Sequence, residues 1–544
     1  MTTIDINKLK EQAKEIRQMI IKRASVDSGH CASPLGVVEL TQALLNVYDF
    51  TKDKIVFDVG HQAHTYKILT GRKNKYFTMS KKGGLTAYPD IYESEYDFYN
   101  TGHSATSTSA ALGFSVGHNE YKSIALVGDG ALTGGEVFEA LNHAGQLQTN
   151  LLVIYNDNSM SIKKNIGALT EKTRLKKFSE SLNFEYRGIF DGHNTELLVK
   201  ELSKIKEIKH PVFLHVKTIK GKGYKPAENE PDRFHWPAPY HIETGQPKKL
   251  MTGESFFTHN YKKGIEFIKK YKNIYFTTPA FVGWGLSGIQ KEFPKNVIDT
   301  GIDEQHCVTF SSALALNKNK VICYLSSNFL PRSLDQLIDV CLQKIPMVFV
   351  ITFPGISDGG PTHQGIYTFP ILNMLPNVQI VHPCNLKEYD KWLDIALESN
   401  KTYFIQTPDE NINYSNEAEE IINIKTGSKL TILPIGNLMG KAIEVANEIS
   451  GVEVLYIPKL KPLNIDLLKK HIQKTKKLLI LEDGFVQSGI GQYIVAQLNI
   501  NDLKYKIIGV SDKFPIQGSL SEVYNDCGLS SKNILKEASD LISL

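Results

Sequence analysis

Two short polar segments in the first third of the chain each follow an apolar run and carry oxygen ligands. Residues 128–130 (GDG) end the run SIALV, and residues 156–158 (NDN) end the run LLVIY. The Asp129 carboxylate and the Asn158 amide oxygen are hard donors of the kind that Mg²⁺ or Ca²⁺ prefers. The glycines let backbone N–H groups approach an anion, so the two segments predict a cation bound together with a diphosphate. The alternative is a pair of strand-end turns with solvated side chains, which GDG alone would favour.

The elements around these segments predict that Asp129 and Asn158 converge. The two apolar runs have the composition of strands, and the segment between them, LTGGEVFEALNHAGQ, has helical periodicity. Two parallel strands joined by one crossover helix present their carboxyl ends at the same sheet edge, where open α/β sheets bind ligands. We expect this helix to begin near Ala131 and to direct its positive end towards the same place.

The rest of the chain repeats this alternation of β-branched runs and helical patterns, which predicts α/β layers with mostly parallel sheets. Three blocks are expected, at residues 1–245, 250–410 and 425–544. Polar stretches at 226–249 and 408–427 have the composition of an ordered loop followed by a linker, and of a second linker.

Composition excludes several classes of partner. The 62 basic and 58 acidic residues leave a formal charge of +4, too small to predict binding to nucleic acid or to an anionic membrane. The six cysteines show no zinc-ligand spacing, and sparse cysteines in a large chain favour a reduced, cytoplasmic location. The amino-terminal segment lacks the apolar core of a signal peptide, and no apolar stretch approaches the roughly 18 residues that span a bilayer.

The GDG…NDN region resembles the thiamine-diphosphate motif of the transketolase superfamily. Further segments, in family order over nearly the whole chain, are more similar to the 1-deoxy-D-xylulose-5-phosphate synthase family; they include DVGHQAHTYKILTGR, TGHSATSTSAALG, KGKGYKPAENEPDRFH, DEQHCVTFSSALA and PTHQG. This resemblance implies a transketolase-like fold of three doubly wound α/β domains with mostly parallel sheets. In chain order, the first domain would bind the cofactor diphosphate with Mg²⁺ and the second would bind the aminopyrimidine. The third would be a smaller C-terminal domain. The resemblance also implies a homodimer.

The same resemblance implies roles for individual residues around thiamine diphosphate. Asp129, Asn158 and the Met160 carbonyl would bind Mg²⁺, Glu304 would hydrogen-bond and activate the aminopyrimidine, and Phe329 would stack on it. Taken singly, Glu304 could be a solvated charge and Phe329 ordinary core packing, as Lys225 could be a solvated charge. The remaining cofactor contacts that carry over are His61, Gly102, His103, Ser104, Gly130, Ala131, Tyr224 and Lys225, with Asn158 and Glu304 again among them.

The substrate side of the implied site contains His30, His363, Arg332 and His235. A histidine can donate to a carboxylate or transfer a proton near neutral pH, and an arginine can hold a carboxylate or phosphate by two parallel hydrogen bonds. The implied reaction condenses pyruvate with an aldehyde, with loss of carbon dioxide, to give a 1-deoxy-ketose. Any one of the sixteen histidines could instead be a structural group.

The sequence departs from the family where the aldehyde acceptor should bind. The family holds the phosphate of glyceraldehyde 3-phosphate partly with two arginines; here the loop at 352–363 contains none, and Gln406 stands in place of the second. Ser326 replaces a family tyrosine. These changes predict a changed acceptor preference. An anionic acceptor is still compatible with the sequence, because Arg332 is present. The segment from Asn158 to Tyr224 is also shorter than in the family, which suggests a more open site or different gating.

Two other functions remain as alternatives. One is transfer of a two-carbon ketol unit without decarboxylation, as in a transketolase; DVGHQAH, GHSATS and THQG favour the decarboxylating reaction instead. The other is a paralogue that binds the cofactor without catalysis. The presence of Glu304, Asp129, Asn158 and His363 argues against it, because an inactive site would be free to lose them.

Overall fold

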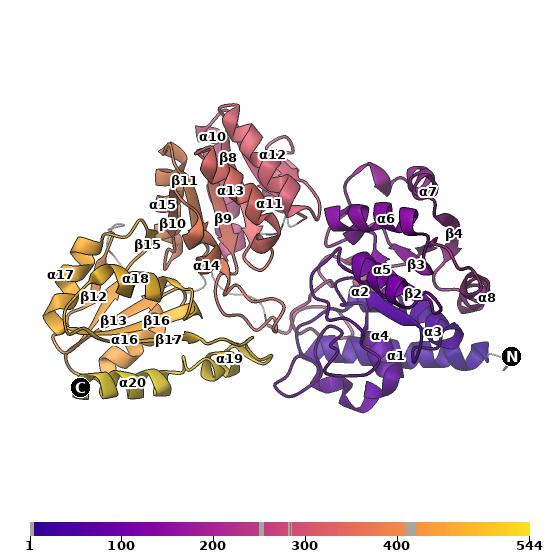
Figure 1. Cartoon of the computed structure of the whole chain (residues 1–544), viewed down its shortest axis with the longest axis horizontal. Helices are drawn as coiled ribbons and strands as arrows, with labels where there is room; N and C mark the ends of the chain where they lie inside the picture. Colours follow the sequence, from indigo (N-terminus) through magenta and orange to yellow (C-terminus); the bar gives the residue numbers. More distant parts are fainter. Residues whose placement is uncertain (1–4, 250–254, 281–282, 284, 409–411, 413–419) are drawn as a thin grey trace. The chain divides into compact units, whose positions relative to one another are not determined.

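The computed structural model describes residues 5–249, 255–280, 283, 285–408, 412 and 420–544. The chain forms two compact units, Met1–Gly253 with Gly301–Asp303, and Glu254–Thr300 with Glu304–Leu544 (Figure 1). Together they contain three sheets whose strands are mostly parallel, which confirms the predicted fold class. Within the described part of the chain, no helix is long and apolar enough to cross a membrane.

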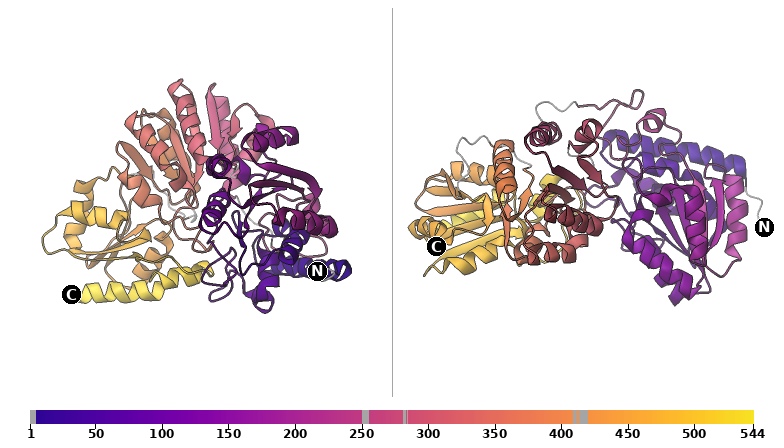
Figure 2. Two further views of the ribbon diagram at one scale, coloured as in Figure 1. Left: turned by 45° about the vertical axis from the view of Figure 1, so that its right-hand side comes forward. Right: turned by 90° about the horizontal axis from the view of Figure 1, so that it is seen from above.

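The first unit is built on a five-stranded, fully parallel sheet covered by helices on both faces (Figure 2). Apolar residues of α3 (Val38–Val47) and α8 (Thr195–Lys206) pack on one face of the sheet. Those of α5 (Ser107–Gly117) and α6 (Gly135–Leu147) pack on the other. The strands, in spatial order, are β1 (Lys54–Phe57), β2 (Ser123–Gly128), β3 (Leu151–Asp157), β5 (Val212–Lys217) and β4 (Glu185–Asp191). The main helices are α1 (Ile6–Val26), α3 (Val38–Val47), α5 (Ser107–Gly117), α6 (Gly135–Leu147), α7 (Lys172–Ser181) and α8 (Thr195–Lys206).

The predicted start of the crossover helix is wrong by about one turn. Residues Ala131–Thr133 form only a short 3₁₀ turn, η3, and α6 begins at Gly135. Gly134 separates the two elements because its backbone is extended, with φ −71° and ψ 140°. The segment after GDG is therefore a tight turn, and the positive end of α6 lies beyond it.

The second unit contains a seven-stranded and a five-stranded sheet that share one apolar core, formed by residues such as Phe349 and Phe404 from the first and Leu433 and Ile480 from the second. The larger sheet has the order β15 (Lys459–Lys461), β10 (Val378–Val381), β11 (Thr402–Gln406), β9 (Val348–Thr352), β8 (Lys320–Ser326), β6 (Ile274–Thr278) and β7 (Val297–Asp299). The smaller has the order β12 (Ile422–Lys425), β14 (Val452–Tyr456), β13 (Leu430–Ile435), β16 (Lys477–Phe485) and β17 (Lys504–Val510).

Helices of the second unit cover both of its sheets. Around the larger sheet they are α10 (Phe256–Lys270), α11 (Leu286–Glu292), α12 (Glu304–Leu316), α13 (Leu334–Leu342), α14 (Thr368–Met374) and α15 (Leu386–Glu398). In the C-terminal part they are α16 (Met439–Glu448), α17 (Ile465–Thr475), α18 (Ile490–Leu498), α19 (Leu520–Asp526) and α20 (Ser531–Ser543).

One edge strand ties the second and third blocks of the sequence together, and another extends the sheet of the third block. β15 follows β14 in the chain but pairs antiparallel with β10 of the larger sheet, and β12 pairs antiparallel with β14. The linker expected at 408–427 therefore ends in a strand; its residues 409–411 and 413–419 lie outside the described residues. The limits of the three expected domains remain a prediction.

Candidate active site

The first group of expected site residues lies at the carboxyl edge of the first sheet. Asp129 follows β2 and is only 3% exposed. Its Oδ2 accepts hydrogen bonds from the backbone N–H groups of Asn158 (2.9 Å) and Met160 (3.1 Å), and its Oδ1 accepts one from Gly130 (3.0 Å). Burial raises the pKa of Asp129 to about 6, while these N–H groups and the Asn165 side chain lower it. The predicted convergence of the two strand ends is thus observed.

The donor set around Asp129 fits a hard divalent cation. The Oδ1 atom of Asn158 is buried and has no hydrogen-bond partner among the described residues, although a buried polar atom normally has one. Oδ2 of Asp129 already accepts two backbone hydrogen bonds, whereas Oδ1 accepts one from the backbone and keeps acceptor capacity. No group of three or more His, Cys, Asp or Glu side chains that could hold a metal exists in the described ranges, so the candidates are carboxylate, amide and carbonyl oxygens. Such a set suits Mg²⁺, with phosphate oxygens and water completing its shell.

The backbone around this site is shaped for close approach. A Cβ atom built on Gly130 would lie 2.4 Å from the Cβ of Ser161, so only glycine fits there. Asp58, which follows β1, accepts hydrogen bonds from the N–H groups of Ala105 (2.9 Å) and Ser107 (3.2 Å). These bonds hold the turn that contains Gly102, His103 and Ser104 at the sheet edge. Val59, Ala105 and Ser159 have positive φ values of 58°, 73° and 65°, and such strained residues cluster at functional sites.

Three of the expected histidines form one cluster in this unit. The ring centroid of His30 lies 4.8 Å from that of His61 and 5.1 Å from that of His235, and the last two are 5.7 Å apart. Burial, and then the charge of Lys220, lower the pKa of His61 to about 3. Burial also lowers the pKa of His235 well below its usual value. The two rings are therefore neutral at physiological pH and act as hydrogen-bonding groups rather than as cations.

Sequence reasoning missed Lys220, a buried cation of this group. Lys220 follows β5, is 5% exposed, donates to the Ser161 carbonyl and lies 3.3 Å from Nδ1 of His235. Burial lowers its pKa to about 8, and the Asp129 carboxylate opposes that shift. Its place just after a strand, at the edge predicted for the diphosphate, is the signal that could have identified it.

The structure does not bring Lys225 into this group. Its side chain is 76% exposed and its ammonium pairs with Glu228 at 3.7 Å, as expected of a solvated charge. The neighbouring Tyr224 is buried, and its hydroxyl donates to the Ile242 carbonyl at 2.8 Å. Its ring packs against Phe234, so Tyr224 contributes to the core of the unit.

The second group of expected residues lies at the carboxyl edge of the larger sheet in the second unit. Glu304 begins α12 and is 4% exposed. Its Oε2 accepts no hydrogen bond from any described residue, and Nη1 of Arg332 lies 3.6 Å away. Burial raises the pKa of Glu304, and Arg332 opposes the shift. A buried carboxyl with a raised pKa and a vacant oxygen is suited to hydrogen-bond a ring nitrogen.

Phe329 and His363 complete this second group. Their ring centroids are 5.9 Å apart with an interplanar angle of 85°, an edge-to-face arrangement. Phe329 directly precedes the 3₁₀ turn η5 (Leu330–Ser333) that carries Arg332, and His363 lies on the loop after β9. The structure therefore brings Glu304, Phe329, Arg332 and His363 to one edge from different elements.

A buried amide lies where the resemblance implies the second phosphate-binding arginine. Gln406 ends β11 and is fully buried. Neither its Oε1 nor its Nε2 has a hydrogen-bond partner among the residues described. Ser326, at the end of β8, donates to Oδ1 of Asn328. Neither position supplies a positive charge.

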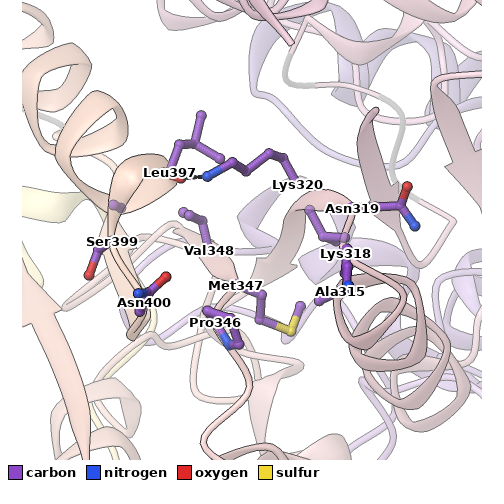
Figure 3. Close-up of a pocket in the computed structure, with 12 residues that line it drawn as sticks. Ala315, Lys318, Asn319, Lys320, Pro346, Met347, Val348, Leu397, Ser399 and Asn400 are labelled. Atoms are coloured by element: carbon purple, nitrogen blue, oxygen red, sulfur yellow. Dashed lines mark hydrogen bonds between the residues drawn. The ribbon is translucent and has the colours of Figure 1, made fainter. Parts of the chain in front are cut away.

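A cavity of about 150 Å³ in the second unit lies away from these residues (Figure 3). Lys320 and Val348, which line it, are at the amino ends of β8 and β9, and Asn400 precedes β11. Lys320 crosses it to bond the Leu397 carbonyl. Because ligands of open α/β sheets bind at the carboxyl ends of the strands, this cavity is not part of the candidate site.

Comparison with known proteins accounts for most of the chain. The family model described as 1-deoxy-D-xylulose-5-phosphate synthase matches residues 1–179 and 172–218. The transketolase pyrimidine binding domain matches residues 265–413, and the transketolase C-terminal domain matches residues 420–534. Among solved structures, the chain is similar to the transketolase of Campylobacter jejuni, with a TM-score of 0.46 and 18% identity, covering 99% of this chain and 100% of that one.

Curated relatives match at higher identity. The chain is 35% identical over 598 residues to the 1-deoxy-D-xylulose-5-phosphate synthase of Clostridium acetobutylicum, covering 97% of this chain and 96% of that protein. It is 36% identical over 600 residues to that of Desulfotalea psychrophila, covering 97% and 93%. Both alignments span more positions than the 544 residues of this chain, so they contain gaps in it. The two pieces of the first family match overlap at residues 172–179, within α7. The chain belongs to the 1-deoxy-D-xylulose-5-phosphate synthase family.

Proposed function

We propose that this chain catalyses the thiamine-diphosphate- and Mg²⁺-dependent condensation of pyruvate with an aldehyde, releasing carbon dioxide and forming a 1-deoxy-ketose. The observation that carries the proposal is a pair of buried oxygen atoms without hydrogen-bond partners in the described chain, Oδ1 of Asn158 and Oε2 of Glu304. Each lies at the carboxyl edge of its own sheet. A cation at the first oxygen and an aminopyrimidine nitrogen at the second would supply the missing partners.

In this proposal the residues of the first unit hold the cofactor by its diphosphate. Asp129, Asn158 and the Met160 carbonyl bind Mg²⁺, and the backbone N–H groups at Gly130 and Ala131 face the phosphates. We propose Lys220, rather than Lys225, as the cation that balances the diphosphate charge, because Lys220 is buried and interacts electrostatically with Asp129. Further contacts come from His61, Gly102, His103 and Ser104, whereas Tyr224 packs in the core of the unit and bonds the Ile242 carbonyl.

The residues of the second unit activate the cofactor and receive the substrate. Thiamine diphosphate, when bound, supplies the electron sink that decarboxylation requires. Glu304 hydrogen-bonds the aminopyrimidine and Phe329 packs against it. Arg332 binds the pyruvate carboxylate, and His363 donates to it or moves a proton. His30 and His235 are proposed as further catalytic residues, which act as hydrogen-bonding groups. We further propose that the protein works as a homodimer in the cytoplasm, where its six free, buried cysteines would stay reduced.

We propose that the phosphate of the acceptor is bound by fewer positively charged groups than the family pattern implies. Gln406 can offer hydrogen bonds but no charge, and a hydrogen bond to a charged group contributes roughly 1.5–3 kcal/mol. We therefore expect glyceraldehyde 3-phosphate to be a weak acceptor. The substitution Gln406→Arg should lower its KM by about tenfold or more, because about 1.4 kcal/mol corresponds to tenfold. Glyceraldehyde without phosphate, the matched control acceptor, should show no such gain.

The proposed function is tested with the purified protein, Mg²⁺ and thiamine diphosphate. Labelled pyruvate is offered with a panel of phosphorylated and neutral aldehydes, while carbon dioxide is counted and each product is identified by mass. We expect carbon dioxide release that depends on the aldehyde, together with a product that contains both substrates. Ketol transfer from a sugar phosphate without carbon dioxide would favour the transketolase reaction instead. Cofactor binding without either reaction would contradict catalysis.

A further inference from the structure

The loop that carries His363 is closed and braced from within. An isolated antiparallel bridge joins Gly355 to Gly365 and closes the loop at its base. Inside it, Oε1 of the buried Gln364 accepts from the Ser357 N–H at 2.9 Å. Nε2 of Gln364 donates to the carbonyls of Ser357 (2.9 Å) and Gly360 (3.0 Å). The loop is thus held together by its own hydrogen bonds, and its orientation depends on the contacts at its base.

A carboxylate from the C-terminal sheet holds that base. Asp483 lies on β16 and is 1% exposed. Its Oδ1 accepts a hydrogen bond from the N–H of Ile356 at 2.9 Å, and its Oδ2 accepts one from Asn437 at 3.3 Å. The carboxylate therefore joins the loop after β9 to the end of β13, in a different sheet.

The fit between loop and carboxylate leaves no room for a side chain. Gly355 has φ +82°, a left-handed conformation that favours glycine. A Cβ atom built there would lie 2.1 Å from Oδ2 of Asp483. Because Ile356 and Asp483 are both buried, loss of the carboxylate would leave the Ile356 N–H buried and unsatisfied.

We propose that Asp483 is a positioning residue for catalysis: the C-terminal sheet uses it to fix the base of the loop and so to present His363 to the substrate. The inference rests on the proposed role of His363 in the reaction. It assigns to the C-terminal sheet a part in the chemistry, although none of the expected catalytic or cofactor-binding residues lies in that sheet. A displacement of about 1 Å can lower a rate by about a hundredfold, so one anchoring contact can matter.

The first test measures the anchor without activity, by amide hydrogen exchange of the full-length protein. The variants are Asp483→Ala, Asp483→Asn and Gly355→Ala, which disturbs the same contact from the loop side. The control is Glu453→Gln, because Glu453 is equally buried on β14 and bonds Asn423 and Thr431 within its own sheet. We expect faster exchange across 354–365 in the first three variants and wild-type exchange there in the control. Unchanged exchange in Asp483→Asn and Gly355→Ala would overturn the proposal.

The second test is a double-mutant cycle with His363→Ala, following carbon dioxide release from pyruvate. Asp483→Asn alone should lower kcat by about tenfold to a hundredfold while the Kd of the cofactor stays within about twofold. In the His363→Ala background the same change should cost little more, because the group that it positions is already gone. Equal losses in both backgrounds would overturn the inference. Normal turnover of His363→Ala would instead contradict the proposed role of His363, and hydrogen exchange would still report on the anchor.

Discussion

The two groups of candidate site residues are built in different ways. In the first unit, Asp129 and the backbone N–H groups that donate hydrogen bonds to it come from two adjacent strand ends joined by a single crossover. In the second unit, Glu304, Arg332 and His363 come from a helix, a 3₁₀ turn and a loop. That loop is anchored by Asp483 of another sheet. The first group is a local motif, and the second depends on how whole layers pack.

The two buried carboxyl groups also differ in what surrounds them. Asp129 accepts three backbone hydrogen bonds, which favour its ionised form and leave it ready for a cation. Glu304 has one guanidinium nitrogen at 3.6 Å and a vacant oxygen. The contrast supports our proposal that Asp129 binds the cation and that Glu304 activates the cofactor, and variants of the two residues should separate these roles.

The largest expected effect is on binding. Asp129→Ala should remove detectable Mg²⁺-dependent binding of thiamine diphosphate, because it deletes the only carboxylate ligand expected at the cation. Isothermal titration calorimetry measures this directly. The matched control is Asp191→Ala, at the exposed end of β4 in the same sheet, which should bind as the wild type does. Wild-type affinity in Asp129→Ala would show that the cation is held elsewhere.

Glu304→Gln should keep cofactor binding and lose cofactor activation, the opposite of Asp129→Ala. We expect the cofactor to stay bound within a few-fold of the wild-type Kd, since the amide keeps the size and most of the contacts of the carboxyl group. Hydrogen exchange at the thiazolium C2 and carbon dioxide release should each fall by about a hundredfold or more, the usual scale of acid–base assistance. NMR follows the C2 proton. If exchange at C2 continued at the wild-type rate, the role of Glu304 in activation would be excluded.

The two lysines provide a smaller test of the first group. Lys220→Met should weaken diphosphate binding by about tenfold, because it removes a buried, charge-assisted contact. Lys225→Met should change the Kd by less than about twofold, as expected for an exposed ion pair. Titration of both variants with thiamine diphosphate at constant Mg²⁺ makes the comparison. The reverse order of effects would restore Lys225 as the phosphate-facing cation.

The smallest effect is one of stability in the protein without cofactor. Burial raises the folded-state pKa of Glu304 above its ordinary value of 4.5, so the folded protein binds more protons than the unfolded chain as pH rises past that value. Wild-type stability contributed by this group is therefore lost with rising pH. Glu304→Gln cannot ionise, so its melting temperature should exceed that of the wild type by more at pH 8 than at pH 5. Thermal scans at both values test this, and a constant difference would mean that Glu304 does not titrate in this way.

Much of the fold could be predicted from the sequence because strand and helix periods are local. Apolar runs such as SIALV and LLVIY are strands where expected, and parallel topology then requires Asp129 and Asn158 to meet. The start of α6 was misplaced because Gly134 breaks the helix through its backbone conformation, which the helical periodicity of its neighbours conceals. Likewise the motif points to Lys225 and not to Lys220, since the type of residue and the motif say nothing of burial.

The residues by themselves determined the strand ends, the polar groups placed there and the family to which the chain belongs, because these follow from local periodicity and from the order of motifs. Only the tertiary structure decided which polar atoms are buried, which buried cation interacts electrostatically with Asp129 and which distant carboxylate holds the loop of His363. The physical reason is that desolvation and close contact between layers depend on packing across sheets. Residues such as Ile356 and Asp483 are far apart in the chain, and nothing in their local sequence encodes the 2.9 Å hydrogen bond from the Ile356 N–H to Oδ1 of Asp483.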